Sequence, residues 1–298
     1  MIEVKNLTKN FDGFTALDNL SLTVQKGSIY GLVGVNGSGK TTVIKHITGV
    51  FKGDSGEIII DGEKVWENPK VKEKIASIPD NLSFFNFYTL KACAGYFSRL
   101  YPEWDWDRYR EMTEKLGLDE KKRLVRFSKG MKKQAAFILA MSSKPAVLIL
   151  DEPLDGLDPL VRRRITKFIM EDVADREMTV LVSSHNLKEL EGICDSVGIL
   201  SGGKMLIEKD LDELKADVSK VQIVFPEGKT PDLSGLNVLY EEKRGSISLL
   251  IIRGDKGEVE DALMAMNPVV IDILPLSLEE IFIYEAGGEN DEFKELLF

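Results

Sequence analysis

Cysteine is scarce in this sequence. Of 298 residues only Cys93 and Cys194 are cysteines, and no CxxC spacing occurs. This pattern excludes a paired-cysteine zinc site and a disulfide scaffold. It favours two free, buried thiols in a reducing compartment.

Long apolar runs are also missing. The longest, such as AVLIL at 146–150, span about five residues, whereas a membrane-spanning helix needs about 20. The N-terminus MIEVKNLTKNF has neither an apolar core nor a cleavage site, so it does not resemble a signal peptide. We therefore expect a cytoplasmic protein that acts on a membrane process only from the membrane's inner face.

Positive charge is in deficit. Lysine and arginine number 39 against 49 acidic residues, which gives a net charge of −10. A general nucleic-acid binder needs a basic surface to neutralise phosphates, so we expect no nucleic-acid partner. With 43% hydrophobic and 30% charged residues, the composition is that of a globular protein.

Strand and helix patterns alternate over residues 1–212. Buried strands are predicted at 28–35, 146–150 and 179–184, and helices at 41–50, 159–174 and 186–194. This order predicts an α/β domain whose sheet is mainly parallel with helices on both faces. Alternating strands at 2–8 and 20–27 add a small antiparallel part, and residues 84–142 form a helical subdomain.

The pattern changes near residue 213. Short strands at 221–225, 237–242 and 246–253, followed by helices at 257–266 and 278–286, predict a small α+β domain over 213–298. Its last ten residues have the composition of a loose tail. Whether this domain regulates, dimerises or only stabilises stays open.

A phosphate-binding loop is the strongest motif. GVNGSGKT at 34–41 matches G-x-x-x-x-G-K-[ST] and lies between a buried strand and a helix, where the mechanism requires it. Glycines let the backbone N–H groups turn toward a phosphate chain, lysine reaches the β and γ phosphates, and threonine ligates Mg²⁺. The nucleotide contacts predicted here are Gly34, Asn36, Gly37, Ser38, Gly39, Lys40, Thr41 and Thr42.

Two further strand ends carry chemistry. LILDEP at 148–153 delivers Asp151 and Glu152 to the carboxyl edge of the sheet, where ligands bind. Asp151 would hold Mg²⁺ through a water and Glu152 would act as general base, although such a pair can also be a helix cap. His185, after the strand TVLVSS, is placed to donate to a γ-phosphate oxygen.

The stretch RFSKGMKKQ at 126–134 begins another helix. Basic residues crowd its first turn, where acidic side chains would normally complement the helix dipole: Arg126, Lys129, Lys132 and Lys133. Exposed N–H groups, the Ser128 hydroxyl and surplus positive charge together predict an anion site.

The order of these motifs resembles the ATP-binding subunits of ABC transporters, a P-loop NTPase family. GVNGSGKT, FSKGM, LILDEP, DGLD at 155–158 and SSH at 183–185 follow one another as in that family, and the resemblance covers residues 1–212. FSKGM is similar to the family signature, with Ser128 and Gly130 kept. The resemblance implies that both residues face ATP bound to a second ATPase subunit, in a homodimer or heterodimer, and that Asp158 lies at the same contact.

Other positions follow from the resemblance alone. Phe11 stands where the family stacks an aromatic ring on adenine; the alternative is an ordinary strand-end phenylalanine. Asp80 replaces a usual glutamine, so it is either a metal-side ligand or a loop acid that caps the next turn. Asp80, FSKGM and YPEWDW together are similar to the Ytr-type and bacitracin-resistance-type bacterial ABC ATPases.

The aromatic residues Phe84, Phe85, Phe87 and Tyr88 have two open roles. They form either the groove that receives a short helix from a membrane permease, as in the family, or ordinary core. The resemblance implies a peripheral ATP hydrolase, with ATP and Mg²⁺ as cofactors and a separate permease, powering export or stress-related transport by ATP-driven dimerisation. A permease-independent ABC ATPase and a nucleotide-sensing regulator are the alternatives.

Overall fold

The computed structural model describes residues 1–84, 87–216, 218–226 and 231–285. The chain divides into an N-terminal unit, Met1–Glu208, and a C-terminal unit, Lys209–Phe298. The sequence pattern placed the boundary between the two domains after residue 212. Phe85 and the expected tail, 289–298, lie outside the described residues. No helix of the described part is long and apolar enough to cross a membrane.

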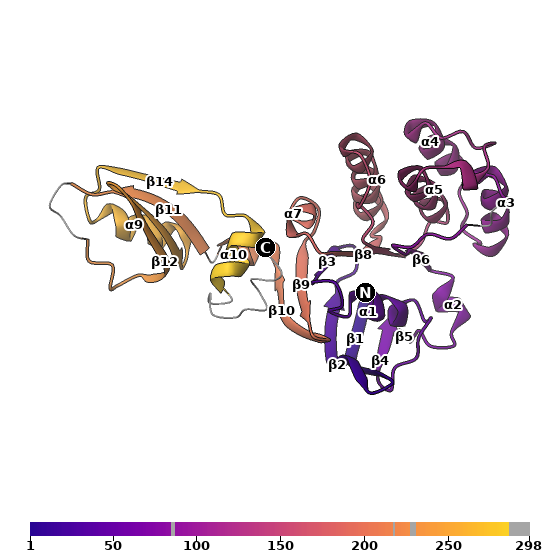
Figure 1. Ribbon diagram of the computed structural model, residues 1–298, viewed down its shortest axis with the longest axis horizontal. Coiled ribbons are helices and arrows are strands. Elements are labelled where there is room, and N and C mark those ends of the chain that lie inside the picture. The colour runs from indigo at the N-terminus through magenta and orange to yellow at the C-terminus, as the bar shows by residue number, and fades with distance from the viewer. Residues whose placement is uncertain (85–86, 217, 227–230, 286–298) are drawn as a thin grey trace. The chain divides into compact units, whose positions relative to one another are not determined.

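The N-terminal unit contains two sheets (Figure 1). An antiparallel sheet has the order β2-β1-β4-β5, and a six-stranded sheet has the order β10-β9-β3-β8-β7-β6. The strands are β1 (Ile2–Phe11), β2 (Phe14–Val24), β3 (Ile29–Val33), β4 (Ser55–Ile60), β5 (Glu63–Lys64), β6 (Ile75–Ile78), β7 (Val147–Asp151), β8 (Thr179–Ser184), β9 (Ser196–Ser201) and β10 (Lys204–Asp210).

The six-stranded sheet is parallel through its centre. Parallel ladders join β3 to β8 and β9, and β7 to β8 and β6. Every residue of β3, β7 and β8 is buried, as expected for parallel strands covered on both faces. The predicted α/β class, with a mainly parallel sheet and a small antiparallel part, is confirmed.

Helices cover this sheet on both sides (Figure 1). Helix α1 (Lys40–Ile47) packs Val43, Ile44 and Ile47 into a core that both sheets share. The remaining helices of the unit are α2 (Pro69–Lys72), α3 (Leu90–Leu100), α4 (Trp106–Leu116), a 3₁₀ turn (Leu124–Arg126), α5 (Lys129–Ser142), α6 (Pro159–Arg176) and α7 (Leu187–Leu190). The helix expected over 186–194 ends at Leu190, after which the chain continues in hydrogen-bonded turns.

The C-terminal unit is an α+β domain, as predicted. Its antiparallel sheet has the order β12-β13-β11-β14, and α9 packs Val259 and Leu263 into a core with β11 and β13. Its elements are α8 (Leu211–Ala216), β11 (Val218–Val224), β12 (Asn237–Arg244), β13 (Ile247–Arg253), α9 (Lys256–Met264), β14 (Val270–Leu274) and α10 (Leu278–Glu285).

Candidate ATP site

A cavity of about 350 Å³ lies where β3 ends and α1 begins. Predicted phosphate-loop residues and acidic residues line it together, although they are far apart in the sequence. Its lining is Phe11, Phe14, Ala16, Val35, Asn36, Gly37, Gly39, Lys40, Thr41, Thr42, Asp80 and Glu152. The fold therefore gathers at one place most of the residues that the sequence assigned to a nucleotide.

The loop before α1 depends on glycine. A Cβ at Gly34 would lie 2.3 Å from the Ser38 Oγ and 2.5 Å from the Leu200 carbonyl oxygen, so no larger residue fits. Gly39 has φ of 111° and precedes α1 without a side-chain cap. Helices α3, α4, α5 and α6, by contrast, begin at capping Thr or Asp or Ser side chains. The uncapped start of α1 leaves N–H groups available to an anion.

Lys40 is 6% exposed and turns back over this loop. Its Nζ donates to the Gly34 carbonyl at 2.6 Å and lies 3.4 Å from the Glu152 Oε1. A buried ammonium held by carbonyls and one carboxylate can exchange these partners for phosphate oxygens.

The two sides of the cavity are joined by short hydrogen bonds. The Thr41 hydroxyl donates to the Asp151 Oδ2 at 2.8 Å, and the Ser183 hydroxyl donates to the Asp151 Oδ1 at 2.6 Å. Ser183 also accepts from the Glu152 N–H at 3.1 Å. Asp151, only 2% exposed, is therefore fixed toward the start of α1, and Ser183 ties the two acidic residues together.

Glu152 and His185 are in contact. The His185 Nδ1 lies 2.8 Å from the Glu152 Oε2, and the His185 N–H also points to this oxygen at 3.4 Å. The Glu152 Oε1 is buried without a hydrogen-bond partner, with the Lys40 ammonium as its charged neighbour. The sequence predicted that His185 donates to a γ-phosphate oxygen. In the structure, one nitrogen of its ring contacts Glu152 instead.

The expectation that Lys133 adds its positive charge to an anion site at the start of α5 was wrong. Lys133 is 1% exposed, and its Nζ donates to the Glu152 carbonyl oxygen at 2.7 Å and lies 3.8 Å from the Asp80 Oδ1. Burial lowers the pKa of this ammonium, and the Asp80 carboxylate opposes the shift. The packing of α5 explains the position, because every residue of this helix from Lys133 to Ser142 is buried.

Two aromatic rings stand at the edge of the cavity. Phe11 is 39% exposed and has its edge contact with Phe51 at 5.6 Å between ring centroids, while the Lys9 ammonium lies 5.3 Å from its ring. Phe14, which the sequence analysis did not single out, is more exposed and lines the same cavity. Both rings are exposed at the cavity edge, where a planar base could pack against them.

The residues expected to meet a partner's ATP lie at another helix start. Ser128 caps α5, accepting from the Met131 N–H at 3.2 Å. A Cβ at Gly130 would lie 3.1 Å from the Gly156 carbonyl oxygen, so this turn packs closely on the DGLD loop. Asp158 caps α6 through the Leu160 and Val161 N–H groups. Ser128 and Gly130 do not line the cavity of their own chain's phosphate loop.

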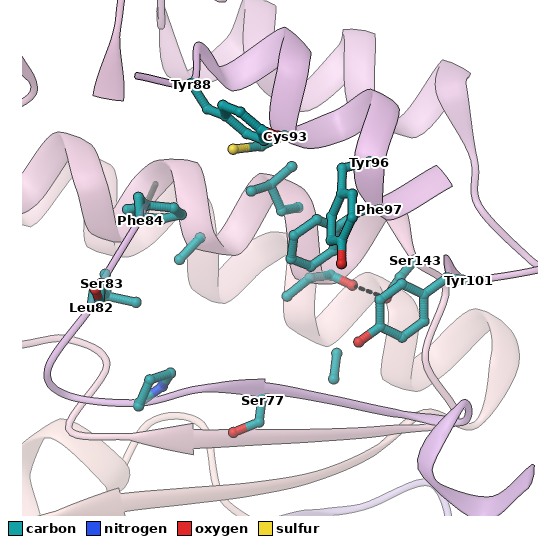
Figure 2. A pocket seen from close by; sticks show the side chains of 15 residues that line it. Ser77, Leu82, Ser83, Phe84, Tyr88, Cys93, Tyr96, Phe97, Tyr101 and Ser143 are labelled. Carbon is teal, nitrogen blue, oxygen red and sulfur yellow. Dashed lines mark hydrogen bonds between the residues drawn. The ribbon is translucent and has the colours of Figure 1, made fainter. Parts of the chain in front are cut away.

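A second cavity, the aromatic cavity of about 290 Å³, lies between β6 and the helical subdomain (Figure 2). Phe84 and Tyr88 line it from the expected aromatic segment, together with rings from α3. Figure 2 shows Tyr96, Phe97 and Tyr101 next to one another in the lining of this cavity. Phe87 is 81% exposed and is not part of the lining.

Comparison with known proteins supports the resemblance. The family model of ABC transporters matches residues 17–155. The ABC transporter ATP-binding protein YtrB of Bacillus subtilis (strain 168) is 35% identical over 97% of this chain and 99% of its own length. The bacitracin transport ATP-binding protein BcrA of Bacillus licheniformis is 32% identical over 97% and 98%.

The fold agrees with these relatives. A solved ATP-binding subunit of an ABC transporter is 29% identical and superposes with a TM-score of 0.67 over 72% of this chain and 92% of its own. The predicted P-loop NTPase fold and the predicted family are thus confirmed. The chain belongs to the ATP-binding, ATP-hydrolysing subunits of ABC transporters.

Proposed function

We propose that ATP binds in the cavity lined by Lys40 and Glu152 and is hydrolysed there to drive a separate membrane permease. One observation carries this proposal: the uncapped start of α1 faces the acidic end of β7, with Thr41 hydrogen-bonded directly to Asp151. A phosphate chain on the loop would thus lie beside a metal-binding carboxylate and a base. Phe11 and Phe14 would receive the adenine.

Mg²⁺ would be held by Thr41 and Asp151, with Asp80 lining the same cavity. These donors fit the ion, because hydroxyl and carboxylate oxygens are hard ligands. In the part of the chain that the structure describes, no three His, Cys, Asp or Glu side chains gather to hold a metal, which suits an ion completed by phosphate oxygens and water. When bound, the ion would neutralise charge on the phosphates.

Glu152 would take the proton of the attacking water. Its Oε1 has no hydrogen-bond partner of its own, whereas Oε2 is held by His185. Lys40 would move from the loop carbonyls to the phosphates, and the ring N–H of His185 would exchange its contact with Glu152 for a γ-phosphate oxygen. In-line attack then transfers the γ-phosphoryl group from ATP to water, and ADP leaves.

The active form would be a dimer that encloses ATP between two ATPase subunits. Ser128 and Gly130 lie at a helix start outside their own chain's ATP cavity, so their anion would belong to the opposing subunit. Whether the second subunit is another copy or a related chain depends on its own residues at this contact.

The aromatic cavity of the helical subdomain would receive the permease and hold the subunit at the inner face of the membrane. Its lining is mainly apolar and suits a short amphipathic helix (Figure 2). BcrA is named a bacitracin transport protein, which supports an antibiotic or another stress-related cargo, and the direction proposed here is export. Cargo choice would lie in the permease.

Co-purification of the tagged chain from its native membrane tests this function. We expect a membrane protein to accompany the wild type and a Trp66→Asp control, which changes an exposed ring outside this cavity, but to be lost with Tyr96→Asp. Hydrolysis should stop when EDTA removes Mg²⁺. ATP hydrolysis without any membrane partner would instead favour a permease-independent ATPase, and ATP binding without hydrolysis would favour a regulator.

A further inference from the structure

Lys133 is a buried cation that the described reaction does not use. It lies on α5, five residues after the Ser128 cap, and its ammonium is buried against the Glu152 carbonyl. The charged groups around it are the Asp80, Glu152 and Asp155 carboxylates and the Lys129 ammonium. A buried charge is stable only when it is paired and hydrogen-bonded, so these contacts decide where the side chain sits.

The contact with Glu152 fixes a strained backbone. Glu152 has φ of 47°, a left-handed conformation that is unfavourable for a residue with a side chain. Its N–H is held by Ser183 at 3.1 Å, and its carbonyl is held by Lys133 at 2.7 Å. The backbone N–H and the backbone carbonyl of Glu152 are therefore both held by hydrogen bonds, and these fix the direction in which its side chain extends.

Through Asp80, Lys133 also contacts the loop that lines the aromatic cavity. Asp80 is 39% exposed and lies 3.8 Å from the Lys133 ammonium. Its neighbours Pro79 and Leu82 line the cavity of Figure 2. A ligand that moves this loop would thus also move the carboxylate that compensates Lys133.

We propose that Lys133 is a positioning residue that ties the Asp80 loop to the backbone of the general base Glu152. The proposal rests on the function proposed above. It means that a movement of the Asp80 loop reaches the Glu152 backbone through one buried ammonium, in addition to the place that Asp80 itself has in the lining of the ATP cavity.

Steady-state hydrolysis and ATP affinity test the role. Lys133→Met keeps most of the length of the side chain but removes its charge, and should lower kcat about tenfold with ATP affinity changed less than about twofold. Asp80→Asn should lower kcat about threefold, and the double variant should fall only as far as Lys133→Met, because the pair acts as one unit. Lys72→Met is the matched control, since Lys72 also donates to a backbone carbonyl, that of Gly49 at 3.0 Å, outside the ATP cavity.

Thermal unfolding without nucleotide provides a second readout. If Lys133 and Asp80 are paired, the two substitutions should lower the melting temperature by less together than the sum of their separate effects. Additive effects, or wild-type kcat in Lys133→Met, would overturn the proposal. A wild type that hydrolyses no ATP would contradict the proposed function instead, and the melting cycle would still decide the pairing. If Lys133→Met does not fold, Asp80→Asn and Lys133→Arg replace it: kcat must drop in the first and be largely retained in the second.

Discussion

Ser183→Ala should destabilise the N-terminal unit more than an ordinary serine substitution. Ser183 is fully buried; it donates to the Asp151 Oδ1 at 2.6 Å and accepts from the Glu152 N–H at 3.1 Å. Each buried group left without its partner costs about 1–3 kcal/mol, and more when the group is charged. We therefore expect the free energy of unfolding to fall by about 2–4 kcal/mol, which for a domain of this size lowers the melting temperature by about 5–10 °C.

Differential scanning fluorimetry without nucleotide measures this shift. Ser142→Ala is the control: Ser142 is equally buried, but its hydroxyl donates only to the Ile138 carbonyl of its own helix, so little should change. ATP hydrolysis should also fall in Ser183→Ala, because the Glu152 N–H loses its partner. A melting temperature within 1 °C of the Ser142→Ala variant would refute the reasoning.

Three further substitutions test two residues of the phosphate loop and His46, a buried residue of α1 outside the ATP cavity. Lys40→Ala should abolish ATP binding in calorimetry, because the one lysine of the phosphate loop is lost; unchanged affinity would contradict the assignment. Gly34→Ala should weaken ATP binding, since its Cβ would lie 2.3 Å from the Ser38 Oγ; normal affinity would show that the loop adapts. Burial lowers the pKa of His46 below 6.5, so the stability it contributes is present above about pH 6.5 and lost as the pH falls through its folded value. Chemical unfolding at pH 7.5 and pH 5 should show this loss, and His46→Gln should reduce it; an equal pH dependence in both proteins would refute it.

The parts of the fold that follow simple patterns were predictable. Buried apolar strands, the glycine loop and capped helices all agree locally with their final structure. β9 was missed because Gly198 interrupts its pattern, and glycine usually weakens a strand. In the structure this glycine makes room for the Tyr30 ring, whose hydroxyl would lie 2.0 Å from a Cβ at position 198.

The site was predictable where a motif and its spacing fix the chemistry, and not where burial decides. Lys40, Asp151 and Glu152 follow from strand ends and loop spacing. Lys133 did not, because a lysine near a helix start is usually exposed, and only the packing of α5 turns it toward Glu152. Ser183 was visible in the SSH motif, but its two contacts depend on the parallel pairing of β7 with β8.

The central claim is that ATP is enclosed between two ATPase subunits and hydrolysed with Glu152 as base. The mass of Glu152→Gln in solution, by light scattering on a sizing column, tests it most directly. We predict that this variant binds ATP without hydrolysing it, has the mass of a dimer with ATP and that of a monomer with ADP, and loses the dimer when Ser128→Arg is added. Normal turnover by Glu152→Gln, or a monomer with ATP bound, would contradict the account.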